Sequence, residues 1–141
     1  MSCDPALADT AAFVEAYGVP LERSANSIIV ASKGAEPMHV ACVVLATTAL
    51  DVNRVVRLEM GVRKASFAAA EPVRALTGME IGGVTPFGLP DTLPVLVDSR
   101  VMETDWIVLG GGNRSSKLKV APDALLRVPS VRVVEGLAIE R

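Results

Sequence analysis

The sequence predicts one mixed α/β domain with many short strands, and three observations support this. The 141 residues suffice for one domain, which would bury roughly two-thirds of the surface of its unfolded chain. Half of the residues are hydrophobic and 21% are charged, as in well-packed globular proteins. Short β-branched runs alternate with helix signals and turns rich in glycine and proline. Without a visible repeat or linker, residues 1–141 are interpreted as a single domain.

The first element is expected to be a helix. Asp4 is a good N-cap, and Pro5 suits the first helical position, where its missing N–H costs nothing. The alanine-rich segment continues to Tyr17, and Gly18 is expected to end the helix.

A β-hairpin is expected next. Residues 27–32 and 38–46 are β-branched apolar runs, and residues 33–37, KGAEP, supply a turn between them. Because the runs are almost continuously hydrophobic, both strands are expected to be largely buried.

The rest of the chain is divided by caps and apolar periodicity. Asp51 is expected to cap a short helix that Gly61 closes, and Gly78 is expected to end another. The expected helices cover 51–60, 71–78 and 122–126, and the expected strands cover 64–68, 94–98, 106–112, 117–120 and 131–135.

Few side chains in this sequence are typical of catalysis. His39 is the only histidine and lies in a strand-like run, where a structural or edge position is the commoner case. Cys42 is interpreted as a core residue, and nothing near Cys3 would activate its thiolate. Asp98 ends an apolar strand, where it could be functional or could cap a turn; capping is the commoner role. No metal site can be assembled from these residues.

Composition also restricts the location and partners. The formal charge of −2 argues against strong non-specific nucleic-acid binding, and hence against DNA as a partner. No apolar run reaches the ~18 residues that cross a bilayer, and no secretory signal is visible. Two cysteines form no disulfide framework, so we expect a reducing, cytoplasmic location. Arg114, Lys117 and Lys119 could touch a phosphate, although a solvated strand face is the commoner explanation.

Residues 82–90, GGVTPFGLP, are the most punctuated segment of the chain. This segment is either a long turn or a rigid loop that aims backbone N–H groups at a ligand. It lacks the lysine and hydroxyl of a phosphate-binding P-loop, and residues 110–113, GGGN, lack the spacing of a dinucleotide-binding motif.

Several ordered motifs resemble the YbaK/ProX aminoacyl-tRNA editing domain. They are ACVVLATT (41–48), LTGMEIGGVTPFGLP (76–90), PVLVDSRV (94–101) and GGGNRSSKLKVAPDALLRV (110–128). The resemblance runs from residue 10 to the final strand, and LTG followed by GGVTPFG is its most specific part. The family contains free-standing deacylases and the editing insertion of bacterial prolyl-tRNA synthetases.

This resemblance implies a single α/β domain around a curved mixed sheet that resembles an open barrel, flanked by short helices. It also implies a trans-acting hydrolase that removes a wrong amino acid from tRNA, typically alanine or cysteine from the proline tRNA, and so maintains translation fidelity. The implied partners are the 3′ end of an aminoacyl-tRNA and an aminoacyl-tRNA synthetase. No cofactor is implied.

The resemblance also implies where the site lies. Gly82, Gly83, Val84, Thr85 and Pro86 match the catalytic Gly-x-x-x-Pro loop, which lines the aminoacyl pocket with backbone groups. Such groups can stabilise an oxyanion without a catalytic histidine. A second glycine segment, formed by Gly110, Gly111 and Gly112, is expected to be the opposing wall of the substrate site.

One position departs from the family pattern. The family carries a lysine and a threonine before its first apolar strand, where this chain has Asn26 and Ser27. Asparagine can form hydrogen bonds but supplies no cation. The alternative function is therefore a non-catalytic protein that binds an aminoacyl-like or nucleotide-like ligand, or a synthetase. Exposed apolar surface on the hairpin would favour a homodimer.

Overall fold

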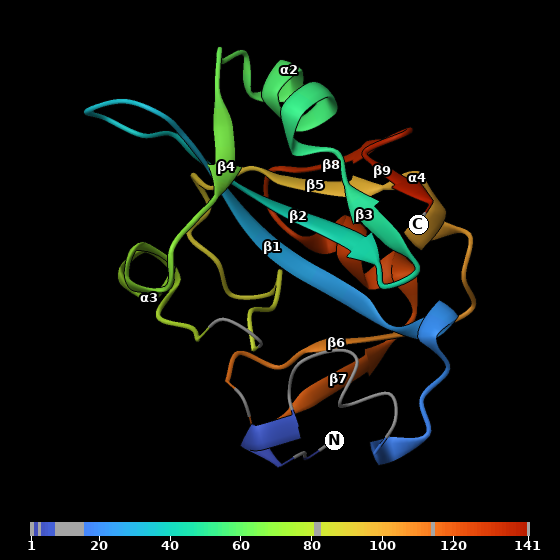
Figure 1. Ribbon diagram of the computed structural model, residues 1–141. Helices are drawn as coiled ribbons and strands as arrows, with labels where there is room; N and C mark the ends of the chain where they lie inside the picture. The colour runs from blue at the N-terminus through green and yellow to red at the C-terminus, as the bar shows by residue number, and fades with distance from the viewer. Residues whose placement is uncertain (1, 3, 8–15, 81–82, 114, 141) are drawn as a thin grey trace.

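The computed structural model describes residues 2, 4–7, 16–80, 83–113 and 115–140. The strands are β1 Ala25–Ser32, β2 His39–Leu45, β3 Thr48–Leu50, β4 Ala65–Phe67, β5 Val95–Asp98, β6 Ile107–Gly110, β7 Lys117–Val120, β8 Val131–Val134 and β9 Ala138–Glu140. The helices are η1 Pro5–Leu7, η2 Leu21–Arg23, η3 Val52–Val56, α2 Arg57–Met60, α3 Ala70–Thr77, α4 Ser99–Met102 and η4 Pro122–Arg127. Most are single turns, so strands dominate the fold (Figure 1).

A mixed five-stranded sheet in the order β4-β1-β2-β5-β8 forms the centre of the molecule. β1 pairs antiparallel with both β2 and β4, whereas β2–β5 and β5–β8 are parallel. Two small antiparallel sheets, β3–β9 and β6–β7, lie on either side of it in Figure 1. The predicted mixed α/β class is confirmed, and the described strands form no closed barrel.

Both faces of the central sheet are covered. Ala41 and Val43 of β2 pack into one hydrophobic cluster, while Cys42 and Val44 pack into another on the opposite face. This two-sided burial confirms the expectation from continuous hydrophobicity. Cys42 is fully buried, and burial raises the pKa of its thiol to about 12, as expected for an inert core residue.

The local signals in the sequence are confirmed where the structure describes them. Asp4 Oδ1 accepts a hydrogen bond from the Ala6 amide, and Asp51 Oδ1 accepts one from the Arg54 amide, so both act as caps. Gly18, Gly61 and Gly78 all adopt the positive φ that ends a helix. Residues 8–15 of the first expected helix lie outside the described residues.

Four elements were not predicted, and the expected exposure of Lys117 was wrong. η2, β3, α4 and β9 are each four residues or shorter, and β3 pairs with β9. Lys117 was expected on an exposed strand, but it is buried opposite Gly110. Lys119 is exposed as expected, with its ammonium 4.3 Å from the centre of the Trp106 ring.

Candidate functional site

The loop of residues 83–86 is folded tightly into the protein. All four of its residues are buried, and Val84 and Thr85 expose only 6% and 5% of their surface. The Gly83 amide donates a hydrogen bond of 2.9 Å to the Glu80 carbonyl, and the Thr85 amide lies 3.5 Å from the Met79 Sδ atom. The loop is therefore held by its own backbone, as expected for the rigid alternative. Gly82 lies outside the described residues.

The second glycine segment packs directly against this loop. The Gly112 amide donates a hydrogen bond of 2.6 Å to the Gly83 carbonyl oxygen. A Cβ atom on Gly83 would overlap the backbone of Asn113, and one on Gly110 would overlap the Val84 carbonyl oxygen. Glycine is thus needed at both positions, because two backbones meet with no room for a side chain.

This contact gives the second segment a structural role in addition to the expected one. Gly110 and Gly112 support the loop from behind, and neither lines the pocket described below. Gly111 lies against Ser116 in the β6–β7 turn. Their contribution to substrate binding stays a prediction.

A small apolar pocket lies where the loop meets the outer edge of β1. Its volume is about 250 Å³, and its lining residues come from β1, the end of β4, α3 and the loop: Ser27, Ile28, Ile29, Phe67, Ala68, Val73 and Val84. Ser27 and Val84 were candidates from the sequence. The other lining residues were missed because strands and loops far apart in the sequence bring them together.

Ser27 and Asn26 lie on opposite faces of β1. Asn26 is paired with Val44 and Ser27 with Val43, and these two valines belong to different hydrophobic clusters. Since directly opposed residues share a face, the Asn26 side chain lies on the Val44 side and the Ser27 side chain on the Val43 side. Ser27, but not Asn26, lines the pocket.

The hydrogen-bonding groups around the pocket are few. The Ser27 Oγ atom is buried, and no described residue forms a hydrogen bond with it. The Val84 amide also has no acceptor among the described residues. Among the described residues no acid, base or cation lines the pocket, so the chemistry that they can supply here comes from backbone groups and one hydroxyl.

The far half of the loop lines a second cavity of about 360 Å³. Residues 86–90 form one side of this cavity, and η4 with residues 127–129 forms the other. Among the described residues of the expected loop, Val84 lines the smaller pocket and Pro86 alone lines this larger cavity.

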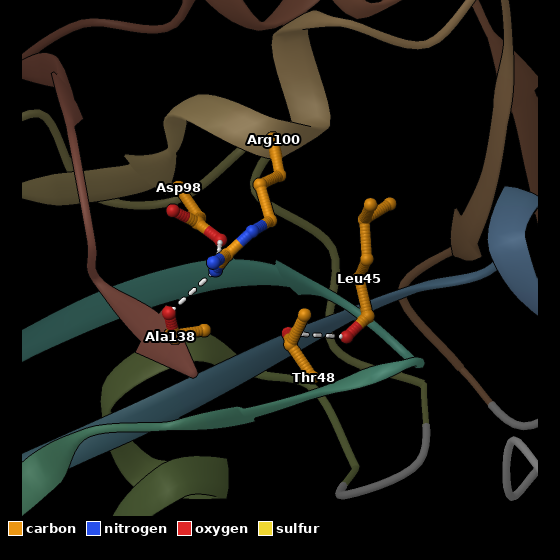
Figure 2. A network of polar contacts seen from close by, with 5 residues as sticks. All are labelled: Leu45, Thr48, Asp98, Arg100 and Ala138. Carbon is orange, nitrogen blue, oxygen red and sulfur yellow. Dashed lines mark hydrogen bonds and ion pairs between the residues drawn. The ribbon is translucent and has the colours of Figure 1, made fainter. Parts of the chain in front are cut away.

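A separate polar cluster surrounds Asp98 at the end of β5 (Figure 2). The carboxylate is fully buried and lies 3.5 Å from Arg100 Nη1, which donates a hydrogen bond of 2.6 Å to the Ala138 carbonyl of β9. Asp98 occupies the N-cap position of α4, as the expected capping role requires, but its side chain makes no capping hydrogen bond of normal geometry. Burial raises the pKa of Asp98, and the nearby Arg100 guanidinium partly opposes this.

His39 and the basic candidates lie away from the pocket lining. His39 begins β2 opposite Ala31, beside the hairpin turn, as expected for a structural position. Lys117 and Lys119 belong to β7, and Arg114 lies outside the described residues, as does Cys3. No helix in the described part of the chain is long and apolar enough to span a lipid bilayer.

Comparison with known proteins identifies relatives of this chain. The profile of the aminoacyl-tRNA editing domain family matches residues 4–128. YwhH, an uncharacterized protein of Bacillus subtilis (strain 168), is 32% identical over 111 residues, which are 79% of this chain and 68% of YwhH.

Two solved structures share the fold. A protein solved as a proposed trans-editing enzyme for prolyl tRNA synthetase has a TM-score of 0.81 and 23% identity over 100% of this chain and 85% of its own. The hypothetical protein APE2540 has a TM-score of 0.80 and 24% identity over 93% of this chain and 84% of its own. At these identities the likeness concerns the fold.

The contact between the glycine segments predicts the effect of Gly110→Ala. The added Cβ atom must displace the Val84 carbonyl, so we expect a loss of about 1–3 kcal/mol in the free energy of unfolding, as for other overpacked sites. Urea denaturation measures this loss, and amide NMR shifts of residues 83–87 should report the displaced loop. Gly136→Ala is the control without a steric overlap, because nothing lies within 4 Å of its Cβ position; its φ of +74°, which Gly110 does not share, adds backbone strain only. Unchanged loop shifts in Gly110→Ala would contradict the tight contact.

The raised pKa of Asp98 predicts how stability depends on pH. Since the folded state holds this proton more tightly than the unfolded state, its contribution is complete below the ordinary aspartate pKa of about 4 and is lost as pH rises through the raised pKa. Asp98→Asn has no proton to lose, so its stability does not share this decline. Its free energy of unfolding should therefore rise relative to wild type as pH increases from about 4 through the raised pKa, and the difference should then become constant. Urea denaturation over a pH series measures the difference, and a difference independent of pH would refute the assignment.

Proposed function

Since the chain belongs to the aminoacyl-tRNA editing domain family, we propose that it is a trans-acting deacylase that hydrolyses the ester of a mischarged tRNA. The proposed substrate carries a small amino acid such as alanine or cysteine on the proline tRNA. The observation that carries this proposal is the family loop, residues 83–86, held rigidly beside a small apolar pocket.

The reaction asks little of side chains. Water attacks the ester carbonyl, the bond from the carbonyl carbon to the ribose oxygen breaks, and the proton lost by water ends on that oxygen. The products are the free amino acid and the tRNA 3′ hydroxyl. Because the ester is already activated, much of the rate comes from holding its carbonyl and the water in place.

The Val84 amide is the best described candidate for stabilising the oxyanion. Gly83 also lies in the loop, but its amide is already bonded to Glu80, whereas the Val84 amide is unused among the described residues. A fixed donor of this kind is typically worth about 3–4 kcal/mol in the transition state. We therefore assign the oxyanion contact to Val84 rather than to Gly83.

The pocket suits a small, apolar amino-acid side chain. Its floor is formed by Ile29, Val73 and Val84, all of them buried. A charged side chain that reached this apolar floor would lose its hydration, and the side chains of the floor have no polar group to replace it. Alanine and cysteine would enter without this cost.

The proposed partners follow from the substrate. The 3′ end of the aminoacyl-tRNA would bind at the pocket, and prolyl-tRNA synthetase would supply mischarged tRNA nearby. We place the activity in the cytoplasm, and a homodimer stays a prediction.

Deacylation assays test this function directly. We expect the pure protein to release alanine or cysteine from the charged proline tRNA faster than the spontaneous rate. Gly83→Ala should lower kcat/KM by about 10-fold to 100-fold, because its Cβ atom displaces the loop from Asn113 and misplaces the reacting groups. Gly136→Ala, in the turn before β9, should retain the wild-type rate. Equal release with wild type, Gly83→Ala and no protein, on both substrates, would reject the deacylase.

A non-catalytic binding protein is the second candidate, favoured by Asn26 in place of the family lysine. Because the Asn26 side chain lies on the face of β1 away from the Ser27 side chain, we expect Asn26→Lys to change kcat little. A sharp rise in kcat would instead show that the wild-type protein has lost a catalytic cation. Asn26→Ala is the companion variant: loss of an existing activity would show that the amide has taken over the role of the lysine.

A further inference from the structure

The backbone of β1 offers hydrogen-bonding groups on two sides, and β2 uses only one. The Ser24 carbonyl accepts a hydrogen bond from the Ala46 amide, and the Ser32 amide donates one to the Met38 carbonyl. Since backbone polar groups alternate in direction along a strand, the even-numbered residues of β1 face β2.

The odd-numbered residues face the outer edge. The Ile29 carbonyl accepts a hydrogen bond from the Ala68 amide, and the ladder with β4 ends where Val30 pairs with Phe67. On the other side, the isolated bridge between Ser24 and Val108 connects β1 to β6. Ser27 lies in the gap, so its N–H and C=O groups point to an edge that no described strand covers.

The Ser27 side chain adds a third unused polar group. Its Oγ atom is buried without a hydrogen-bond partner among the described residues, and Ser27 lines the pocket beside Val84. Buried polar groups in native proteins are almost always satisfied. A buried hydroxyl without a partner among the described residues, beside two backbone groups that face the uncovered edge, is therefore suited to binding a polar ligand.

The number of hydrogen-bond acceptors and donors at this edge indicates which kind of ligand it can bind. Two of them, the Ser27 carbonyl oxygen and Oγ, can accept hydrogen bonds, and none of the described lining residues is a cation that would attract an anion. An ammonium group carries three donors and no acceptor. An ammonium group therefore matches the acceptors at this edge, and an apolar group attached to the same carbon would occupy the apolar floor of the pocket.

We propose that the open edge of β1 at Ser27 binds the α-ammonium group of the substrate, so that the site accepts aminoacyl esters and rejects esters whose amino group is acylated. This inference rests on the proposed function and names its substrate class. Acylation removes the positive charge and two of the donors, and adds bulk where the strand edge lies. Peptidyl-tRNA and N-formylaminoacyl-tRNA are then excluded.

Three substrates test this requirement: alanyl-tRNA, N-acetylalanyl-tRNA and lactyl-tRNA, in which a hydroxyl replaces the amino group. For the wild-type protein, kcat/KM should fall by about 10-fold to 100-fold on each analogue, the loss typical of a hydrogen bond to a charged group. Ser27→Ala should lower kcat/KM for alanyl-tRNA and leave lactyl-tRNA unchanged, so the selectivity shrinks. Ser66→Ala, on β4 outside the pocket, should preserve the wild-type selectivity. Equal kcat/KM on all three substrates would overturn the inference.

A binding measurement keeps the inference separate from catalysis. Alanine joined by an amide to 3′-amino-3′-deoxyadenosine resists hydrolysis and is compared with its N-acetyl form. Only the free amine should shift the amide NMR signals of Ser27 and Ile28, even if no tRNA is hydrolysed and the proposed function fails. Equal shifts with both compounds, or none with either, would refute the ammonium site. Ser27→Ala should fold normally and melt no lower than wild type, because the Oγ atom has no hydrogen bond to lose.

Discussion

The site depends on the close approach of two backbone segments. One contains Gly83, and the other runs from Gly110 to Asn113. Side chains normally keep loops apart by several ångströms, but here the Gly112 amide reaches the Gly83 carbonyl at 2.6 Å. This contact fixes Val84 at the pocket and ties the loop to β6, which the Ser24–Val108 bridge connects to β1. The loop, the pocket and the strand edge thus share one rigid frame, as preorganised electrostatic catalysis requires.

A second constraint is the incomplete pairing of β1. β2 pairs with seven of its residues, whereas β4 pairs with only three, because the chain leaves the sheet after Phe67 and enters α3. In most proteins such an edge is blunted by charge or covered. Here α3 and the loop lie beside the edge and leave a pocket, which is the binding surface that we propose.

Two of the buried titratable residues, Cys42 and Asp98, show that burial alone does not mark an active site. Cys42 and Asp98 both have raised pKa values, and in both cases burial is the main cause. Cys42 lies in a cluster of hydrophobic residues, and none of them could activate its thiol. Asp98 lies beside Arg100, whose hydrogen bond to Ala138 connects the end of β5 in the central sheet to β9 in the small β3–β9 sheet. Neither residue lines the pocket.

The sequence by itself determined the local structure of this protein. The hairpin around residues 33–37, the cap at Asp51 and the helix ends at Gly61 and Gly78 all depend on neighbours within a few residues, and all were predicted. The glycine loop was also found, because its composition is unusual and its motif resembles a family. Tertiary structure alone decided the pairing of β3 with β9, the burial of Lys117 and the position of Val73 at the pocket. It also decided that Ser27 faces an open edge, since a strand has two sides and only the folded chain shows which one is left uncovered.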